Sequence, residues 1–289
     1  MKIRFLLAAV ALGLAILVLS LSLLSDPTPW ARADVRADIQ ANANATIYYV
    51  KEGGSSTDCS EANPCGTIQQ ALDKAVYGDE VRVAGGNYRE ALRIDRGVKL
   101  RGGWDGAFAS QDPRTYPTLI SPEVITHILR INAPPDDGVL VEALTLHDGQ
   151  DGIHIWNSKV TVSGCEIYNL EKQGIEVEKG QVTITNTRIL TAQQNLEMDG
   201  GTVQVLSSTL ALAHEESILV EQSNPDQSTI TVKRSIIEHS GNQGVHINNG
   251  TVTLSQNHIR HVISDGIKVD GGMVVMTDNV ISNITGYAA

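Results

Sequence analysis

Short runs of alternating apolar and polar residues recur along the chain from about residue 139 to the end. The pattern is clearest over 244–259 and again over 266–281. Aligned on the apolar residue that opens each unit, the units are spaced by 22, 21, 22, 27 and 22 residues, and they begin at Ile153, Ile175, Leu196, Ile218, Val245 and Ile267. Repetition at such a period is typical of a solenoid.

Each unit contains three such runs, represented in one unit by residues 175–178, residues 182–184 and the single apolar residue Ile189. Alternation with a period of two predicts strands, because successive side chains of a strand point to opposite faces. The runs are too short for helices, and glycines such as Gly180 and Gly250 separate them and favour turns. The sequence therefore predicts an all-β parallel β-helix with three-strand coils of about 22 residues.

Stacking these coils places equivalent residues on top of one another. We expect two inner aliphatic columns, one of Ile155, Val177, Met198, Val220, Ile247 and Val269, and one of Val160, Val182, Val203, Ile230, Val252 and Val274. At the turn before the third strand, small side chains should hydrogen-bond along the stack in a ladder of Cys165, Thr187, Ser208, Ser235, Asn257 and Asn279.

The region before the clean repeats, residues 46–78, is predicted to hold a strand, a cysteine-containing loop and one short helix. Thr67–Gln70 fits a capping box, apolar residues follow at helical spacing, and Gly78 would end the helix. Such a helix can cover the open end of the stack. Residues 79–83, 92–94 and 98–100 are then expected to form the first coil of a β-helix that spans residues 79–289.

Composition agrees with a thin aliphatic core: 42% of the residues are hydrophobic, only 4% are aromatic, and 26 are glycine. The net charge of −11, with no basic block, argues against nucleic acid as a partner. Residues 1–33 contain an apolar run from Phe5 to Leu24 and read as a cleaved signal peptide or a retained membrane anchor, with 34–45 as a flexible leader. We therefore expect a secreted or cell-surface protein that meets a membrane only through that segment.

We expect Cys59 and Cys65 to form a disulfide, because they lie close together in a Ser/Asn/Pro-rich loop of an exported chain, where disulfides persist. The third cysteine, Cys165, falls in the predicted turn ladder. We expect it to be a buried, inert thiol rather than a reactive one.

The opening of the predicted β-helix region resembles that of exported bacterial right-handed parallel β-helix proteins of the pectin lyase-like superfamily. The resemblance rests on Tyr49–Val50, Cys59, Pro64–Ala71, Gly78–Val83, Asn87–Glu90 and Gly97–Gly102. The resemblance implies a right-handed solenoid. Members of that superfamily include polysaccharide lyases, glycoside hydrolases, epimerases and adhesins. The Gly-His-Gly and Arg-Ile-Lys motifs of polygalacturonase-type members are missing, and Ser264–Lys268 is the nearest fragment. The chain also stops as another coil begins, so we expect the β-helix to be incomplete at that end.

Outward positions of the first strand form two further columns. One holds His154, Glu176, Glu197, Leu219, His246 and Lys268, and its neighbour holds Trp156, Glu178, Asp199, Glu221, Asn248 and Asp270. Within them, Glu176, Glu178, Glu197 and Asp199 form a rectangle of like charge. This cluster predicts a Ca²⁺ site, unless the carboxylates form only a solvated acidic stripe.

Trp156 should face solvent, where its ring can stack on a sugar, although it could instead pack under a neighbouring turn. His154, His246 and Lys268 are candidate bases, with ordinary surface residues as the alternative. The extra residues of the 27-residue unit, 222–227, could wall a cleft or be a tolerated insertion.

Together these features predict a protein that binds an extracellular polysaccharide along its first-strand face. Cleavage or modification by a lyase or hydrolase mechanism is an open possibility. The alternative is a non-catalytic surface or adhesion module in which the stack is a spacer.

Overall fold

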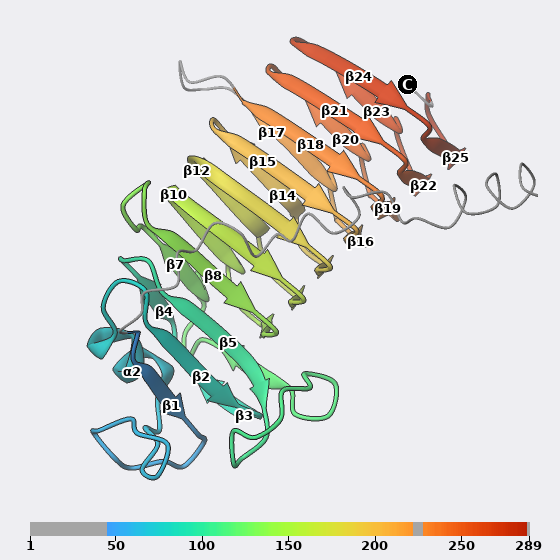
Figure 1. Ribbon diagram of the computed structural model, residues 1–289. Coiled ribbons are helices and arrows are strands. Elements are labelled where there is room, and N and C mark those ends of the chain that lie inside the picture. The colour runs from blue at the N-terminus through green and yellow to red at the C-terminus, as the bar shows by residue number, and fades with distance from the viewer. Residues whose placement is uncertain (1–44, 222–227, 288–289) are drawn as a thin grey trace, which may run out of the picture. The chain divides into compact units, whose positions relative to one another are not determined.

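The computed structural model describes residues 45–221 and 228–287. These residues form a parallel β-solenoid whose coils stack in chain order from β1 to β25 (Figure 1). The proposed signal peptide or anchor, the leader up to residue 44 and the insertion 222–227 lie outside the described residues. In the part of the chain that is described, no helix has the length and apolar character needed to cross a membrane.

The first strands of the coils carry one face of the solenoid. They are β4 (Leu92–Ile94), β7 (Leu129–Ile131), the first part of β10 (Ile153–Ser163), the first part of β12 (Gln173–Thr185), β14 (Gln194–Asp199), β17 (Ile218–Glu221), β20 (Val245–Ile247) and β23 (Ile267–Val269).

The second strands are β1 (Ile47–Val50), β2 (Glu80–Ala84), β5 (Lys99–Trp104), β8 (Gly138–Glu142), the second parts of β10 and β12, β15 (Thr202–Leu206), β18 (Thr229–Lys233), β21 (Thr251–Ser255) and β24 (Met273–Thr277). The third strands form a separate nine-stranded sheet of β3 (Gly86–Arg89), β6 (Thr118–Ser121), β9 (Thr145–His147), β11 (Glu166–Tyr168), β13 (Arg188–Leu190), β16 (Thr209–Ala211), β19 (Ile236–Glu238), β22 (His258–Val262) and β25 (Val280–Ile284).

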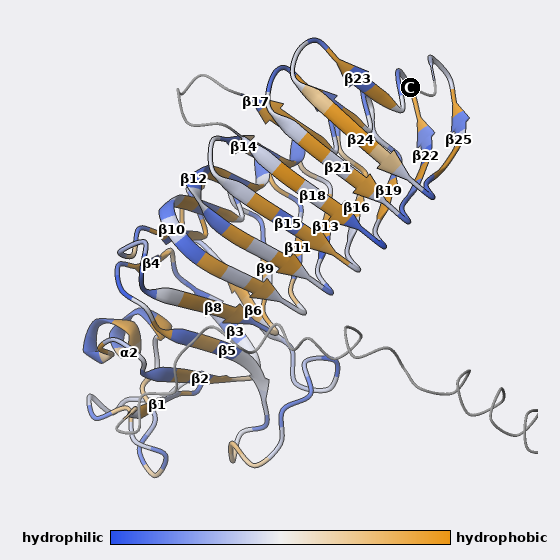
Figure 2. Ribbon diagram, turned by 45° about the horizontal axis from the view of Figure 1, so that its top comes forward, coloured by the Kyte–Doolittle hydropathy of each residue, from blue (hydrophilic) through white to orange (hydrophobic). Residues whose placement is uncertain are grey.

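The inner aliphatic columns form in the predicted register. Ile155 pairs with Val177, Val177 with Met198, and so on through Val220 and Ile247, each of them fully buried. Hydrophobic bands line up from one coil to the next across the second strands (Figure 2). Val269 was predicted to be buried but is 47% exposed. It lies in β23, the C-terminal member of the series of first strands, and no further described strand covers it.

The polar turn ladder is also present. Each backbone N–H donates to the side chain one coil further on: Cys165 to Thr187 Oγ1 (3.4 Å), Thr187 to Ser208 Oγ (3.2 Å), Ser208 to Ser235 Oγ (3.2 Å), Ser235 to Asn257 Oδ1 (2.9 Å), and Asn257 to Asn279 Oδ1 (2.9 Å). These side chains thus accept hydrogen bonds from buried backbone N–H groups at the turn, which would otherwise lack a partner. Cys165 is buried and unpaired with another cysteine, and burial raises the pKa of its thiol to about 12.

A short helix, α2 (Ile68–Lys74), packs against β1, β2 and β4 with Ile68, Ala71 and Leu72 buried. Thr67 caps it by accepting a hydrogen bond from the Gln70 N–H at 3.4 Å. The helix ends at Lys74 rather than running to Gly78, because Ala75 is already extended (φ −62°, ψ 141°). Since β1 pairs with β2, residues 46–78 continue the solenoid instead of standing apart from it.

The first coil differs from the prediction. Its strands are β2, β3 and β4, whereas residues 98–100 belong mainly to β5 of the next coil. The pattern missed β3 because its only large apolar side chain is that of Tyr88, which is buried and donates its hydroxyl to the Ala84 carbonyl at 3.0 Å.

The loop before α2 is closed by a disulfide between Cys59 and Cys65. Its backbone is tied to β1, since Cys65 N–H donates to the Tyr49 carbonyl at 2.9 Å. In the insertion after β5, the buried Phe108 packs edge-on against Tyr49, with ring centroids 4.9 Å apart.

Candidate functional site

The outward face of the first strands carries the candidate functional residues. The strand pairing stacks His154 on Glu176, Glu176 on Glu197, and His246 on Lys268, as predicted. It also adds two members that the sequence pattern did not reveal, so that the column reads Arg93, Arg130, His154, Glu176, Glu197, Leu219, His246 and Lys268. The face therefore runs from basic through acidic to basic along the stack.

His154 lies between two of the predicted cation ligands. Its Nδ1 is 3.0 Å from Glu176 Oε2, and its Nε2 is 3.4 Å from Glu178 Oε1. The neighbouring Glu176 carboxylate raises the pKa of His154, and the same contact lowers the pKa of Glu176. The arrangement favours an imidazolium held by two carboxylates over a free base.

A second histidine and a buried acid support this cluster. Asp151 is 1% exposed and lies 2.5 Å from Nδ1 of His127, whose ring meets His154 edge-on with centroids 5.0 Å apart. Asp151 Oδ1 also accepts the backbone N–H of Gln173, 22 residues later, at 3.1 Å.

The sequence contained a signal for this structural acid. Asp265 precedes the glycine that opens a first strand, as Asp151 does, and its Oδ1 likewise accepts the N–H of a residue 22 positions later, Tyr287 (2.9 Å). An aspartate directly before that glycine thus marks a link between successive coils.

The four carboxylates predicted to hold Ca²⁺ do not all converge on one point in this structure. Among the described residues, Glu176 and Glu178 group with His154, each offering one ligand atom within 4.8 Å of the others, and Glu197 and Asp199 are outside this group. Glu197 Oε2 instead accepts a hydrogen bond from Gln173 Nε2 at 2.5 Å. Burial raises the pKa of Glu197, and the negative charge of Glu176 raises it further.

Trp156 is 50% exposed, so half of its surface is open to solvent. With His154 it lines a pocket of about 280 Å³ whose other walls are Arg130, Ile131 and Asn132. The turn after Trp156 is held by the buried Ser158, whose hydroxyl lies 2.6 Å from the Trp156 carbonyl and accepts the Ala133 N–H at 2.9 Å. These hydrogen bonds hold the backbone that carries the tryptophan side chain.

The other two candidate bases form a second cluster further along the column. His246 Nε2 lies 2.9 Å from Asp270 Oδ2, and Lys268 Nζ lies 2.7 Å from the same oxygen and 3.3 Å from His246 Nε2. On its other side, His246 Nδ1 is 3.7 Å from Glu216. The hydrogen bonds from Lys268 and His246 lower the pKa of Asp270.

Comparison with known proteins defines the class of fold. The family model described as "Right handed beta helix region" matches residues 130–251, and no curated protein sequence matches the chain. The structure of pectate lyase Pel9A is similar, with a TM-score of 0.66 and 12% identity over 86% of this chain and 74% of that chain. The described chain is thus a right-handed parallel β-helix, which confirms the predicted fold class.

Two further solved structures match more weakly. The polygalacturonase from Erwinia carotovora ssp. carotovora has a TM-score of 0.47 at 12% identity, over 86% of this chain and 96% of that chain. The pectin methylesterase from Aspergillus niger has a TM-score of 0.45 at 12% identity, over 86% and 87%.

Proposed function

We propose that this protein binds an extracellular polysaccharide along its first-strand face, with Trp156 as the platform on which a sugar ring stacks. The observation that carries the proposal is the half-exposed indole at the edge of the pocket formed with Arg130, Asn132 and His154. Flat apolar rings with polar groups around them suit sugars, which present C–H faces and hydroxyl edges. The similarity in fold to a protein named as a pectate lyase is consistent with this substrate class.

Charge along the face bears on the kind of polysaccharide. Arg130 lies beside the pocket and can pair with a sugar carboxylate, whereas Glu176 and Glu178, on the next coil, would repel one. We propose that a uronate chain needs Ca²⁺ to pass the acidic coils, and that a neutral glycan does not. A Ca²⁺ ion held by all four predicted carboxylates requires His154 to leave Glu176 and Gln173 to release Glu197.

Binding is favoured over cleavage by the state of the candidate bases. His154 is paired with two glutamates, and both His246 and Lys268 are paired with Asp270. A ring or amine nitrogen that donates hydrogen to a carboxylate has no lone pair there with which to take a proton from a substrate. The second candidate function, a lyase or hydrolase, depends on the cluster of His246, Lys268 and Asp270, where substrate could displace one partner.

Export to the cell surface or beyond is part of this proposal. It is supported by the apolar N-terminal run from Phe5 to Leu24 and by the disulfide between Cys59 and Cys65, because disulfides persist in oxidising compartments.

The test is a panel of neutral and uronate polysaccharides, measured for binding and for new chain ends, with and without Ca²⁺. The proposal predicts binding of at least one polysaccharide, and Ca²⁺ dependence only for uronates. New chain ends would establish the catalytic alternative. A folded protein that binds no glycan under either condition would support the non-catalytic spacer or adhesion module instead.

A further inference from the structure

A ladder of left-handed residues follows the third strands, on a different sheet from the first-strand face. From β11 onward, one residue at or near the end of each third strand has a positive φ: Asn169 (56°), Thr191 (53°), Leu212 (57°), His239 (56°), His261 (55°) and Asn283 (54°). The last two lie within the strands β22 and β25. In two successive coils this residue is histidine. The pairing of Glu238 with Arg260 in β19 and β22 places His239 beside His261.

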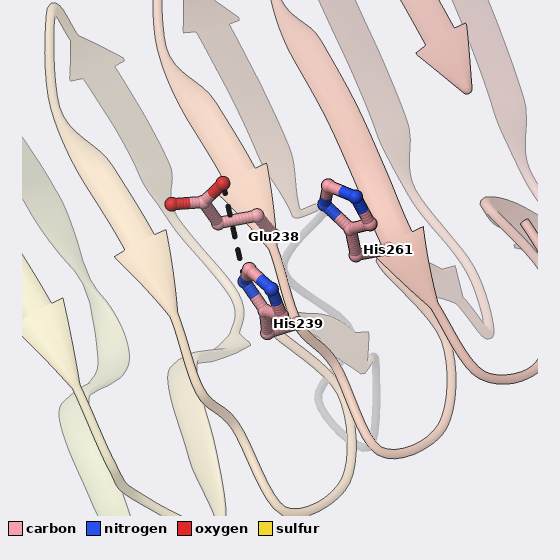
Figure 3. Close-up of side chains that lie close together, drawn as sticks. All are labelled: Glu238, His239 and His261. Carbon is pink, nitrogen blue, oxygen red and sulfur yellow. Dashed lines mark ion pairs between the residues drawn. The ribbon is translucent and has the colours of Figure 1, made fainter. Parts of the chain in front are cut away.

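The two imidazoles stack with their centroids 4.8 Å apart and their planes inclined by 15°. Glu238 joins them, with Oε2 3.9 Å from His239 Nδ1 (Figure 3). One ligand atom from each of Glu238, His239 and His261 lies within 4.8 Å of the others. Both histidines are exposed, so an ion can reach them from solvent without opening the core.

This donor set has a particular preference. Two imidazole nitrogens with one carboxylate oxygen suit Zn²⁺, Ni²⁺ and Cu²⁺, whereas Ca²⁺ and Mg²⁺ prefer oxygen ligands alone. In a tetrahedral zinc site, ligand atoms lie about 3.3 Å apart, since each is about 2.0–2.1 Å from the metal. Rotation of the exposed side chains can close the remaining gap, because the backbone already holds the two histidines on adjacent coils.

Two neighbouring residues are placed to orient the ligands. Arg260 Nε lies 2.7 Å from Glu238 Oε2, the same oxygen that faces His239, and so fixes the position of this carboxylate beside the histidines. The side-chain amide nitrogen Nδ2 of Asn283 lies 3.1 Å from His261 Nε2, and the oxygen and nitrogen of an amide can be exchanged by a half-turn of the group. With the amide turned so that its oxygen accepts an Nε2–H, the Nδ1 of His261 becomes the ligand atom, as in many metal sites where the second ring nitrogen is hydrogen-bonded.

We propose that Glu238, His239 and His261 bind a Zn²⁺-class divalent ion that clips together two successive coils near the C-terminal part of the solenoid. Water completes the coordination. The site is separate from the polysaccharide proposal, since it lies on the third-strand sheet.

Isothermal titration of the full chain with Zn²⁺ tests the proposal, with circular dichroism to verify folding. The parent should bind one Zn²⁺ in this way, and His239→Gln and His261→Gln should lose that binding. His258→Gln is the matched control, because His258 is an exposed histidine of the same strand β22 outside the cluster. It should bind like the parent. Asn283→Ala should weaken binding by about tenfold or more, as loss of an orienting partner does.

Replacing Zn²⁺ by Co²⁺ reports on the coordination geometry, because Co²⁺ held tetrahedrally by nitrogen and oxygen ligands absorbs visible light. The His261→Gln substitution should abolish this absorption. Excess Ca²⁺ should not compete. The proposal is overturned if the folded parent binds no Zn²⁺, or if the His239 and His261 variants bind it as well as the parent does. It is also overturned if His154→Gln, and not His261→Gln, removes the binding, since the ion would then belong to the first-strand face.

Discussion

The inner and outer faces of the first-strand sheet are made by alternate residues of the same strands, yet they differ in almost every respect. Inside, Ile155, Val177 and Met198 are all fully buried aliphatic side chains that repeat one chemistry from coil to coil. Outside, their immediate neighbours His154, Glu176 and Glu197 change character and bond to different partners. The repeat therefore constrains the fold, and the residues between the repeated ones are free to carry function.

The largest expected effect comes from placing a charge on the inner face. Val177→Asp buries an unpaired carboxylate between Ile155 and Met198, which should destabilise the fold by several kcal/mol and unfold neighbouring coils. Thermal or denaturant unfolding measures the loss.

The matched control is Gln181→Asp, since Gln181 is an exposed residue of the same strand, β12. It should change stability by no more than about 0.5 kcal/mol, as surface substitutions generally do. If the Val177→Asp variant had the same melting temperature as the parent, this would contradict the assignment of Val177 to the buried inner face.

Calcium should give the next largest effect, on the outer face. If Glu176, Glu178, Glu197 and Asp199 hold Ca²⁺, the ion should stabilise the folded chain by about 2.7 kcal/mol at a hundredfold excess over Kd. Mg²⁺ should do less, because it demands tighter geometry and gives up water reluctantly. Differential scanning calorimetry with each ion measures the shift.

The double variant Glu197→Gln, Asp199→Asn should lose the calcium response. It should also melt higher than the parent without metal, because Glu197 is half-buried beside like charges that disfavour its ionised form. A double variant that gains stability, alongside a parent that ignores calcium, would reduce the patch to a repulsive surface.

The turn ladder offers a polar change inside the solenoid. Asn257 is fully buried; its side chain accepts from Ser235 N–H at 2.9 Å and donates to the Val232 carbonyl at 2.8 Å. Asn257→Ala leaves these groups unpaired and should cost about 2 kcal/mol, within the range for unsatisfied buried groups. Urea unfolding measures the loss, and an unchanged midpoint would show that the ladder contributes nothing to stability.

The smallest effect concerns pH and the pair of His154 and Glu176. The pKa of His154 is raised in the folded protein. Its contribution to the free energy of unfolding is therefore full below the ordinary pKa of 6.5 and is lost as pH rises through the raised pKa. The pKa of Glu176 is lowered, so its contribution is full above 4.5 and is lost as pH falls through the lowered pKa. The pair should stabilise the fold most between about pH 4.5 and 6.5, by about 1 kcal/mol at most.

Melting temperatures of the parent and His154→Gln across pH 3–9 check this window. The difference between the two proteins should shrink at both ends of the range. A difference that stays constant with pH would mean that the pair does not contribute through its charges.

The sequence predicted the inner columns and the turn ladder because residues such as Val177 and Asn257 recur at one period, and a period maps directly onto stacking. The coil that contains β3 was wrongly assigned because Gly86–Arg89 offers only Tyr88 as an apolar position. The irregular spacing of the early coils likewise hid Arg93 and Arg130 from the outer column.

The direction of outer side chains could not be read from the sequence. Strand pairing fixes which Cβ atoms are neighbours, as it does for Glu176 and Glu197, but torsions and competing partners decide where the carboxylates point. Glu197 accepts a hydrogen bond from Gln173, and Glu176 faces His154. In the structure, Glu176 and Glu178 therefore group with His154 instead of with the other two carboxylates.

The most direct test of the central claim is the affinity of the best-bound polysaccharide for the parent, Trp156→Ala and Tyr287→Ala, measured by isothermal titration. Tyr287 is an 80% exposed aromatic residue away from the pocket and serves as the control. We expect Trp156→Ala to bind at least about tenfold more weakly, a change of about 1.4 kcal/mol, and Tyr287→Ala to bind like the parent. Undiminished binding by a folded Trp156→Ala protein would contradict the assignment of the first-strand face as the polysaccharide site.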